Sequence, residues 1–128
     1  MLLNSVFGLV AQRFRKFDHE FDDERGHATK LIERMLFLEG TPDMITRTGF
    51  KVGKDVPEML ESDLRVEYEV DAKLREVIAL CETEKDYVTR DMLIVLLDDT
   101  EMDHAHWLEQ QIGLIKRLGL QNYLQSQM

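Results

Sequence analysis

Two glutamate–histidine pairs are the residues of this sequence whose types and spacing could do chemistry. Glu24 stands three positions before His27, and Glu101 stands three positions before His104. Positions i and i+3 lie on one face of an α-helix, so one metal ion can take an oxygen and a nitrogen from a single helical turn. Carboxylate and imidazole ligands together suit iron or manganese, and zinc also accepts them.

The elements that must position these pairs are three long helices. The first is predicted over about residues 17–38, the second over 55–82 and the third over 86–118, and a short helix over 120–128 ends the chain. Gly40-Thr41-Pro42 stops the first helix, and Gly119 is placed to cap the third. No stretch has the alternating pattern of a strand, so the sequence predicts an all-α protein.

Start signals for the second helix are clear, and a long loop precedes it. Asp55, with Glu58 three residues later and Pro57 in the first turn, marks the helix N-terminus. The loop carries Gly49 and Gly53 and is long enough for a crossover between parallel neighbours rather than a tight hairpin.

Each long helix carries an apolar stripe in steps of three and four residues, and acids interrupt all three stripes. The stripes consist of Phe17, Phe21, Ala28, Leu31, Met35 and Leu38 on the first helix, of Leu60, Leu64, Leu74, Ile78 and Cys81 on the second, and of Leu93, Leu97, Leu108, Ile112 and Ile115 on the third. Glu24 fills one step of the first stripe. Glu67 and Asp71 interrupt the second, and Glu101 shares the face of the third with His104.

A carboxylate that faces a core must be neutralised, paired with a base or bound to a cation. We find no arginine or lysine on the facing stripes, which leaves histidine as the companion of these acids. Two Glu-x-x-His turns joined by a third core-facing glutamate, Glu67, form the ligand set expected of a di-iron carboxylate bundle. The alternatives are that Glu24 and His27 form a solvated pair at the stripe edge, and that the second helix carries an ordinary solvated acidic face made of Asp63, Glu67, Glu69 and Asp71.

Composition bounds the remaining possibilities. The chain has 128 residues, so we expect a single domain over 1–128. Its net charge of −9 argues against nucleic acid and anionic membrane surfaces as partners and favours cations. The apolar run over residues 1–11 is too short to span a bilayer, and a single cysteine, Cys81, fits a reducing compartment, so a cytoplasmic protein is predicted.

Four segments closely resemble bacterioferritin. They are His27-Ala-Thr-Lys-Leu-Ile-Glu-Arg-Met-Leu-Phe-Leu-Glu-Gly40, Asp55-Val-Pro-Glu-Met-Leu60, the stretch Asp86-Tyr-Val-Thr-Arg-Asp91 that leads into Glu101 and His104, and Gly119-Leu-Gln-Asn-Tyr-Leu-Gln-Ser-Gln-Met128. The resemblance covers roughly residues 18–128. It implies a ferritin-like antiparallel helical bundle with a long crossover loop and a short C-terminal helix.

The resemblance also implies a function and roles for the candidate ligands. Glu24 and Glu101 match the carboxylates that bridge two irons, His27 matches a terminal ligand of one iron, and Glu67 and His104 match the ligands of the other. The implied protein stores and detoxifies iron: it is a ferroxidase that oxidises Fe(II) to Fe(III) at this centre and holds ferric mineral in a 24-subunit shell. In this reading Glu24, Glu67 and Glu101 are also the catalytic residues.

Two departures from the family pattern qualify these expectations. Bacterioferritins begin with a helix that supplies a sixth ligand, a glutamate on the iron held by His27. Residues 1–17 contain no acid, so we expect that helix to be truncated or missing. In addition, Arg25 occupies the position at which haem-binding members place a methionine, and we expect little or no haem bound in that manner. A non-catalytic or partly active structural subunit, assembled with a full-length partner or left as a truncated relic, is therefore the alternative to a homo-oligomeric ferroxidase.

Overall fold

The computed structural model describes residue 22, residues 25–45 and residues 51–127. The described residues form helices joined by turns and loops, and no strand occurs among them, which confirms the predicted all-α class. The chain divides into two compact units, one formed by Met1–Thr48 with Leu118–Met128 and the other by Gly49–Arg117. We call them the first and the second unit. The single domain over residues 1–128 stays a prediction.

In the second unit, helix α2 (Val56–Glu84) begins where the sequence predicts. Asp55 is its N-cap, and its side chain accepts a hydrogen bond of 2.9 Å from the backbone N–H of Glu58. The Glu58 side chain in turn accepts from the backbone N–H of Lys54 at 2.8 Å. These reciprocal bonds satisfy donors that the first helical turn leaves open, and they fix the start of α2.

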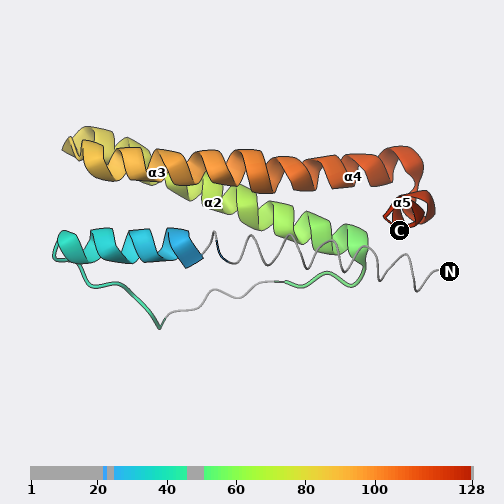
Figure 1. The fold of residues 1–128 in the computed structure, drawn as a ribbon, viewed down its shortest axis with the longest axis horizontal. Helices are drawn as coiled ribbons and strands as arrows, with labels where there is room; N and C mark the ends of the chain where they lie inside the picture. The colour runs from blue at the N-terminus through green and yellow to red at the C-terminus, as the bar shows by residue number, and fades with distance from the viewer. Residues whose placement is uncertain (1–21, 23–24, 46–50, 128) are drawn as a thin grey trace. The chain divides into compact units, whose positions relative to one another are not determined.

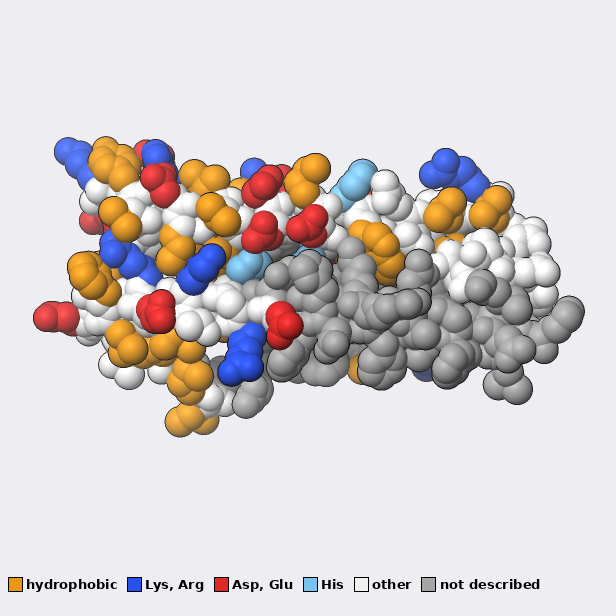
Figure 2. Space-filling model, viewed as in Figure 1, with side chains coloured by type: hydrophobic (Ala, Val, Ile, Leu, Met, Phe, Trp, Pro, Cys, Tyr) orange, Lys and Arg blue, Asp and Glu red, His pale blue; other side chains and the backbone are white. Residues whose placement is uncertain are grey.

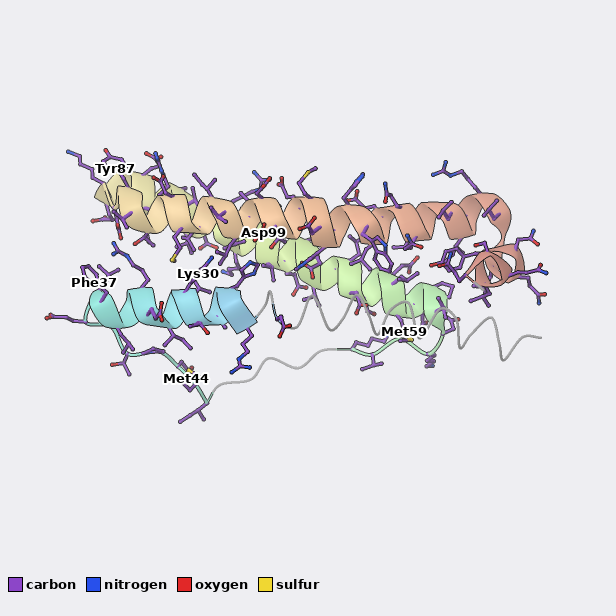
Figure 3. The ribbon with its side chains drawn as sticks, in the orientation of Figure 1. Lys30, Phe37, Met44, Met59, Tyr87 and Asp99 are labelled. Carbon is purple, nitrogen blue, oxygen red and sulfur yellow. The ribbon has the colours of Figure 1, made fainter. Side chains whose placement is uncertain are left out.

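The third predicted helix is one continuous helical rod with an irregular middle. It comprises α3 (Tyr87–Asp99), the π-helical segment η1 (Thr100–Ala105) and α4 (His106–Leu118), as Figure 1 shows. In Figure 3 the labelled Tyr87 lies at the beginning of α3 and Asp99 at its end, immediately before η1. The candidate residues Glu101 and His104 therefore lie near the middle of the rod.

A two-residue turn joins α2 to α3 and makes them an antiparallel hairpin. Lys85 has a φ of 58°, and the next backbone N–H, that of Asp86, donates to the carbonyl of Cys81 at 2.9 Å. This closing pattern normally favours glycine at the left-handed position. Asp86 also caps α3 by accepting from the backbone N–H of Thr89 at 3.1 Å. The hairpin places α2 against both α3 and η1.

The strained position at Lys85 gives a prediction about stability. Replacing Lys85 with glycine should raise the free energy of unfolding by about 0.5–1 kcal/mol, because glycine adopts a positive φ without a Cβ clash. Lys73→Gly is the matched control, since Lys73 is exposed in the interior of the same helix, where glycine should destabilise by about 1 kcal/mol. Urea denaturation followed by circular dichroism measures both. A loss of stability in Lys85→Gly would contradict the assignment of this turn.

In the first unit the described residues form a helix over 25–37, which ends close to the predicted Leu38. Glu39, immediately before Gly40, has a left-handed backbone with a φ of 62°. At the C-terminal end, Gly119 has a φ of 78° and is followed by the short helix α5 (Leu120–Ser126), as predicted. The predicted crossover between parallel neighbours stays a prediction.

The surface carries many apolar side chains. Val88, Ile94 and Val95 of α3 and Met102 of η1 are exposed, and Figure 2 shows hydrophobic groups interspersed with acidic and basic ones on the visible face. None of the helices in the described part of the chain combines the length and the apolar character needed to cross a bilayer.

Candidate metal site

The predicted stripe of α2 is confirmed as the face that α2 buries. Every member of it is buried or half-buried, and the two interrupting acids, Glu67 and Asp71, are covered to a similar extent. The members are Leu60, Leu64, Leu74, Ile78 and Cys81. Helical periodicity therefore directs Glu67 and Asp71 toward the partner helix, where a carboxylate needs a cation or a donor.

The facing candidates lie in the π-helical segment. The backbone N–H of His106 donates to the carbonyl of Glu101, which is the five-residue spacing of a π turn. A π turn is wider than an α turn, so residues three apart are rotated further from one another around the axis. His104 consequently points inward and is 3% exposed, whereas the Glu101 side chain is 42% exposed. Glu101 and His104 thus face different surroundings although they belong to one turn.

Glu67 and His104 form the central contact of the candidate site. The Nδ1 atom of His104 lies 3.5 Å from Oε2 of Glu67. That separation is too long for a good hydrogen bond. Two ligand bonds of about 2.1 Å at a tetrahedral angle hold their donor atoms about 3.4 Å apart, so the spacing fits an oxygen and a nitrogen that share one metal ion. The donor set, one carboxylate and one imidazole, suits divalent iron.

Glu101 has a different partner, which sequence reasoning missed. Arg75 of α2 donates from Nε to Oδ1 of Asp71 at 2.6 Å, and its Nη2 donates to a carboxylate oxygen of Glu101. This hydrogen bond from Arg75 holds the pKa of the Asp71 carboxyl below its usual range. The expectation that no arginine or lysine neutralises the core-facing acids is therefore wrong for Asp71 and Glu101. The i,i+4 spacing of Asp71 and Arg75 is the signal that could have revealed the pair.

Tyr68 makes a second contact that the sequence did not predict. Its hydroxyl donates to Oε1 of Glu109 on α4 at 2.6 Å, and this bond to a carboxylate raises the pKa of Tyr68. Half of the Tyr68 side chain is exposed, and its hydroxyl links α2 to α4. Because Tyr68 directly follows Glu67, this hydrogen bond helps to fix the position of α2 relative to α4 beside the candidate site.

The remaining predicted ligands belong to the first unit. Glu24 lies outside the described residues. His27 lies on the helix of residues 25–37, as does Arg25, whose side chain is exposed. Within residues 22, 25–45 and 51–127, no three His, Cys, Asp or Glu side chains come close enough to enclose one metal ion. The structure thus brings Glu67 and His104 together and directs Glu101 to Arg75.

Comparison with known proteins identifies the family. The family described as "Ferritin-like domain" matches residues 11–118. The chain is 59% identical over 115 residues to a protein of Synechocystis named bacterial ferritin, covering 90% of this chain and 74% of that protein. It is 54% identical over 114 residues to a bacterial ferritin of Pseudomonas aeruginosa, covering 89% and 73% of the two chains. A bacterioferritin of Brucella melitensis is 37% identical over 109 residues, covering 85% and 67%. This chain belongs to the ferritin-like family.

Proposed function

We propose that this protein stores iron, and that it oxidises Fe(II) to Fe(III) at a di-iron centre within the chain and holds the ferric product in an oligomeric shell. Two observations support the proposal. Relatives at 54–59% identity are named bacterial ferritin. In addition, the Glu67–His104 contact presents an oxygen and a nitrogen at the spacing that one metal ion needs. The contact is the observation that carries the proposal.

Each of the five candidate ligands is assigned to one or both iron ions. By the resemblance to bacterioferritin, Glu67 and His104 would hold one Fe(II) ion and His27 the other, and Glu24 and Glu101 would supply carboxylates to both. Anionic oxygen ligands favour Fe(III) over Fe(II), so carboxylates ease the loss of one electron from each ion to an oxidant such as dioxygen. The burial of His104 keeps its ring from bulk water and fixes its orientation. The net charge of −9 helps to concentrate the cationic substrate near the protein.

The proposal includes a compartment and an assembly. A cytoplasmic location is consistent with the single cysteine, Cys81, whose side chain is buried in the structure. A shell of 24 copies, or a mixed shell with a longer subunit, would provide the cavity in which mineral accumulates. Native mass spectrometry of the purified protein distinguishes the two assemblies.

Anaerobic titration with Fe(II), followed by addition of oxygen, tests the function. We expect about two Fe(II) ions to bind per chain and to oxidise faster than in buffer at the same pH. Binding of fewer ions, with oxidation no faster than in buffer, would contradict the ferroxidase. That result would support the alternative of a structural subunit in a mixed shell, which the ion pair between Arg75 and Glu101 favours.

A further inference from the structure

A cluster of three charged side chains lies beside the Glu67–His104 contact. We call it the Arg75 cluster; it consists of Asp71 and Arg75 on α2 and Glu101 on η1. Arg75 binds both carboxylates at once, Asp71 through Nε at 2.6 Å and Glu101 through Nη2. All three residues belong to the second unit. The guanidinium therefore occupies the place between two carboxylates that a cation would otherwise favour.

The cluster and the proposed iron ligands lie along the same helix pair. Glu67, Asp71 and Arg75 follow one another at intervals of four residues, so they line one face of α2. Opposite them, His104 contacts Glu67 and Glu101 contacts Arg75. Glu101 thus has two possible cationic partners: the guanidinium that it binds in this structure, and a metal ion held three residues further along by His104.

We propose that Arg75 is a positioning residue that holds Glu101 in the metal-free protein and releases it when a divalent cation binds. This inference rests on the proposed function, because it takes Glu101 to be a ligand of the iron substrate. The guanidinium and a metal ion compete for the negative charge of Glu101, and two cations so close together repel each other, so metal binding is favoured when the guanidinium moves away. Arg75 then stays bound to Asp71, which prevents its charge from being left without a partner.

The expected effect is modest because the pair is exposed. Arg75 is 56% exposed and Glu101 42%, and ion pairs of such exposure are weak and are screened by salt. Competition by Arg75 should weaken cation binding by about two- to fivefold. The direction of the change in cation affinity distinguishes the two possible roles of Arg75. A residue with a purely structural role would support the site, and its removal would weaken binding, whereas removal of a competitor strengthens it.

The experiment measures cation affinity without turnover. Co(II), which does not oxidise under these conditions, is titrated anaerobically into the full chain and followed by its absorption bands. Arg75→Gln should bind Co(II) about two- to fivefold more tightly than the unmodified protein, and the gain should shrink in high salt. Arg75→Lys keeps the charge but lacks the forked geometry that joins both carboxylates, so its gain should be smaller.

Arg90→Gln is the matched control. Arg90 also bridges two carboxylates, Glu82 at 2.6 Å and Asp91 at 2.7 Å, but neither is a candidate ligand. The Arg90→Gln substitution should leave the Co(II) affinity unchanged, because it removes one positive charge at a position that does not contact Glu101. Circular dichroism checks that each variant is folded. If Arg75→Gln does not fold, the Co(II) affinity of Arg75→Lys is compared with that of the unmodified protein instead.

The outcomes separate this inference from the proposed function. Tighter binding in Arg75→Gln alone supports it. Equal or weaker binding in Arg75→Gln, or an equal gain in Arg90→Gln, overturns the inference while the proposed function stands. If neither the unmodified protein nor Arg75→Gln binds Co(II), the proposed function fails and the inference fails with it.

Discussion

Replacement of His104 by alanine should lower the affinity for one of the two Fe(II) ions by about 100-fold or more and remove rapid iron oxidation. His104 supplies the only nitrogen in the Glu67–His104 contact, and its ring is 3% exposed, so no bulk water can readily replace it. Loss of residues that merely orient metal ligands costs 10- to 100-fold in affinity, and loss of a ligand itself should cost at least as much. The measurement is the anaerobic Fe(II) titration followed by stopped-flow oxidation.

His106→Ala is the control for this prediction. His106 lies two residues away at the start of α4, and its side chain is 56% exposed and bonded to Gln110 at 3.1 Å. Iron binding and oxidation by this variant should match the unmodified protein. Glu67→Gln adds a second test at the same contact, because it keeps the shape of the side chain and removes its charge. Unchanged oxidation in both His104→Ala and Glu67→Gln would exclude this contact as an iron site.

Leu93→Ala should destabilise the protein by about 2–4 kcal/mol. Leu93 is 3% exposed on α3, and truncation of a buried leucine loses its transfer free energy and leaves a cavity. The hairpin of α2 and α3 supports η1, so we also expect weaker cation binding in this variant. Denaturant unfolding, monitored by circular dichroism, gives the change in free energy.

The neighbouring residue supplies the control for the core. Ile94 follows Leu93 on the same helix and is 44% exposed, so Ile94→Ala removes a side chain of the same size from the surface. Its cost should stay below about 1 kcal/mol. Equal losses in Leu93→Ala and Ile94→Ala would contradict the assignment of the inner face of α3.

Helical periodicity predicted the second helix well, because α2 keeps a regular turn along its length. Its stripe of apolar residues and its cap at Asp55 are found as expected, and Glu67 faces the partner helix as a result. The third stripe was predicted less accurately. Leu96 and Thr100 are buried although they were not assigned to it, whereas Glu101 is half-exposed. Leu96 lies before η1 and follows Leu93 at the regular spacing of three residues, so the turn of η1 does not account for its burial. A regular α-helical period cannot anticipate the wider turn of η1, which separates Glu101 from His104.

Partners of charged side chains could not be predicted from stripes alone. Arg75 lies on the same face of α2 as Glu67 and Asp71 but is not part of the apolar stripe, and its long side chain extends from there to Glu101. In the first unit, Leu31 is half-buried but Met35 and Leu38 are exposed, so the stripe predicted there is only partly covered. The roles of Glu24 and His27 as ligands stay predictions.

The π-helical segment η1 has a consequence for the rest of the rod. Each residue added to a helix rotates everything after it by about 100° around the axis. The wider turn at Thr100–Ala105 therefore sets the angular phase of α4 relative to α3, and with it the direction in which Leu108 points. The segment that carries Glu101 and His104 thus also determines which residues of α4, Leu108 among them, turn inward.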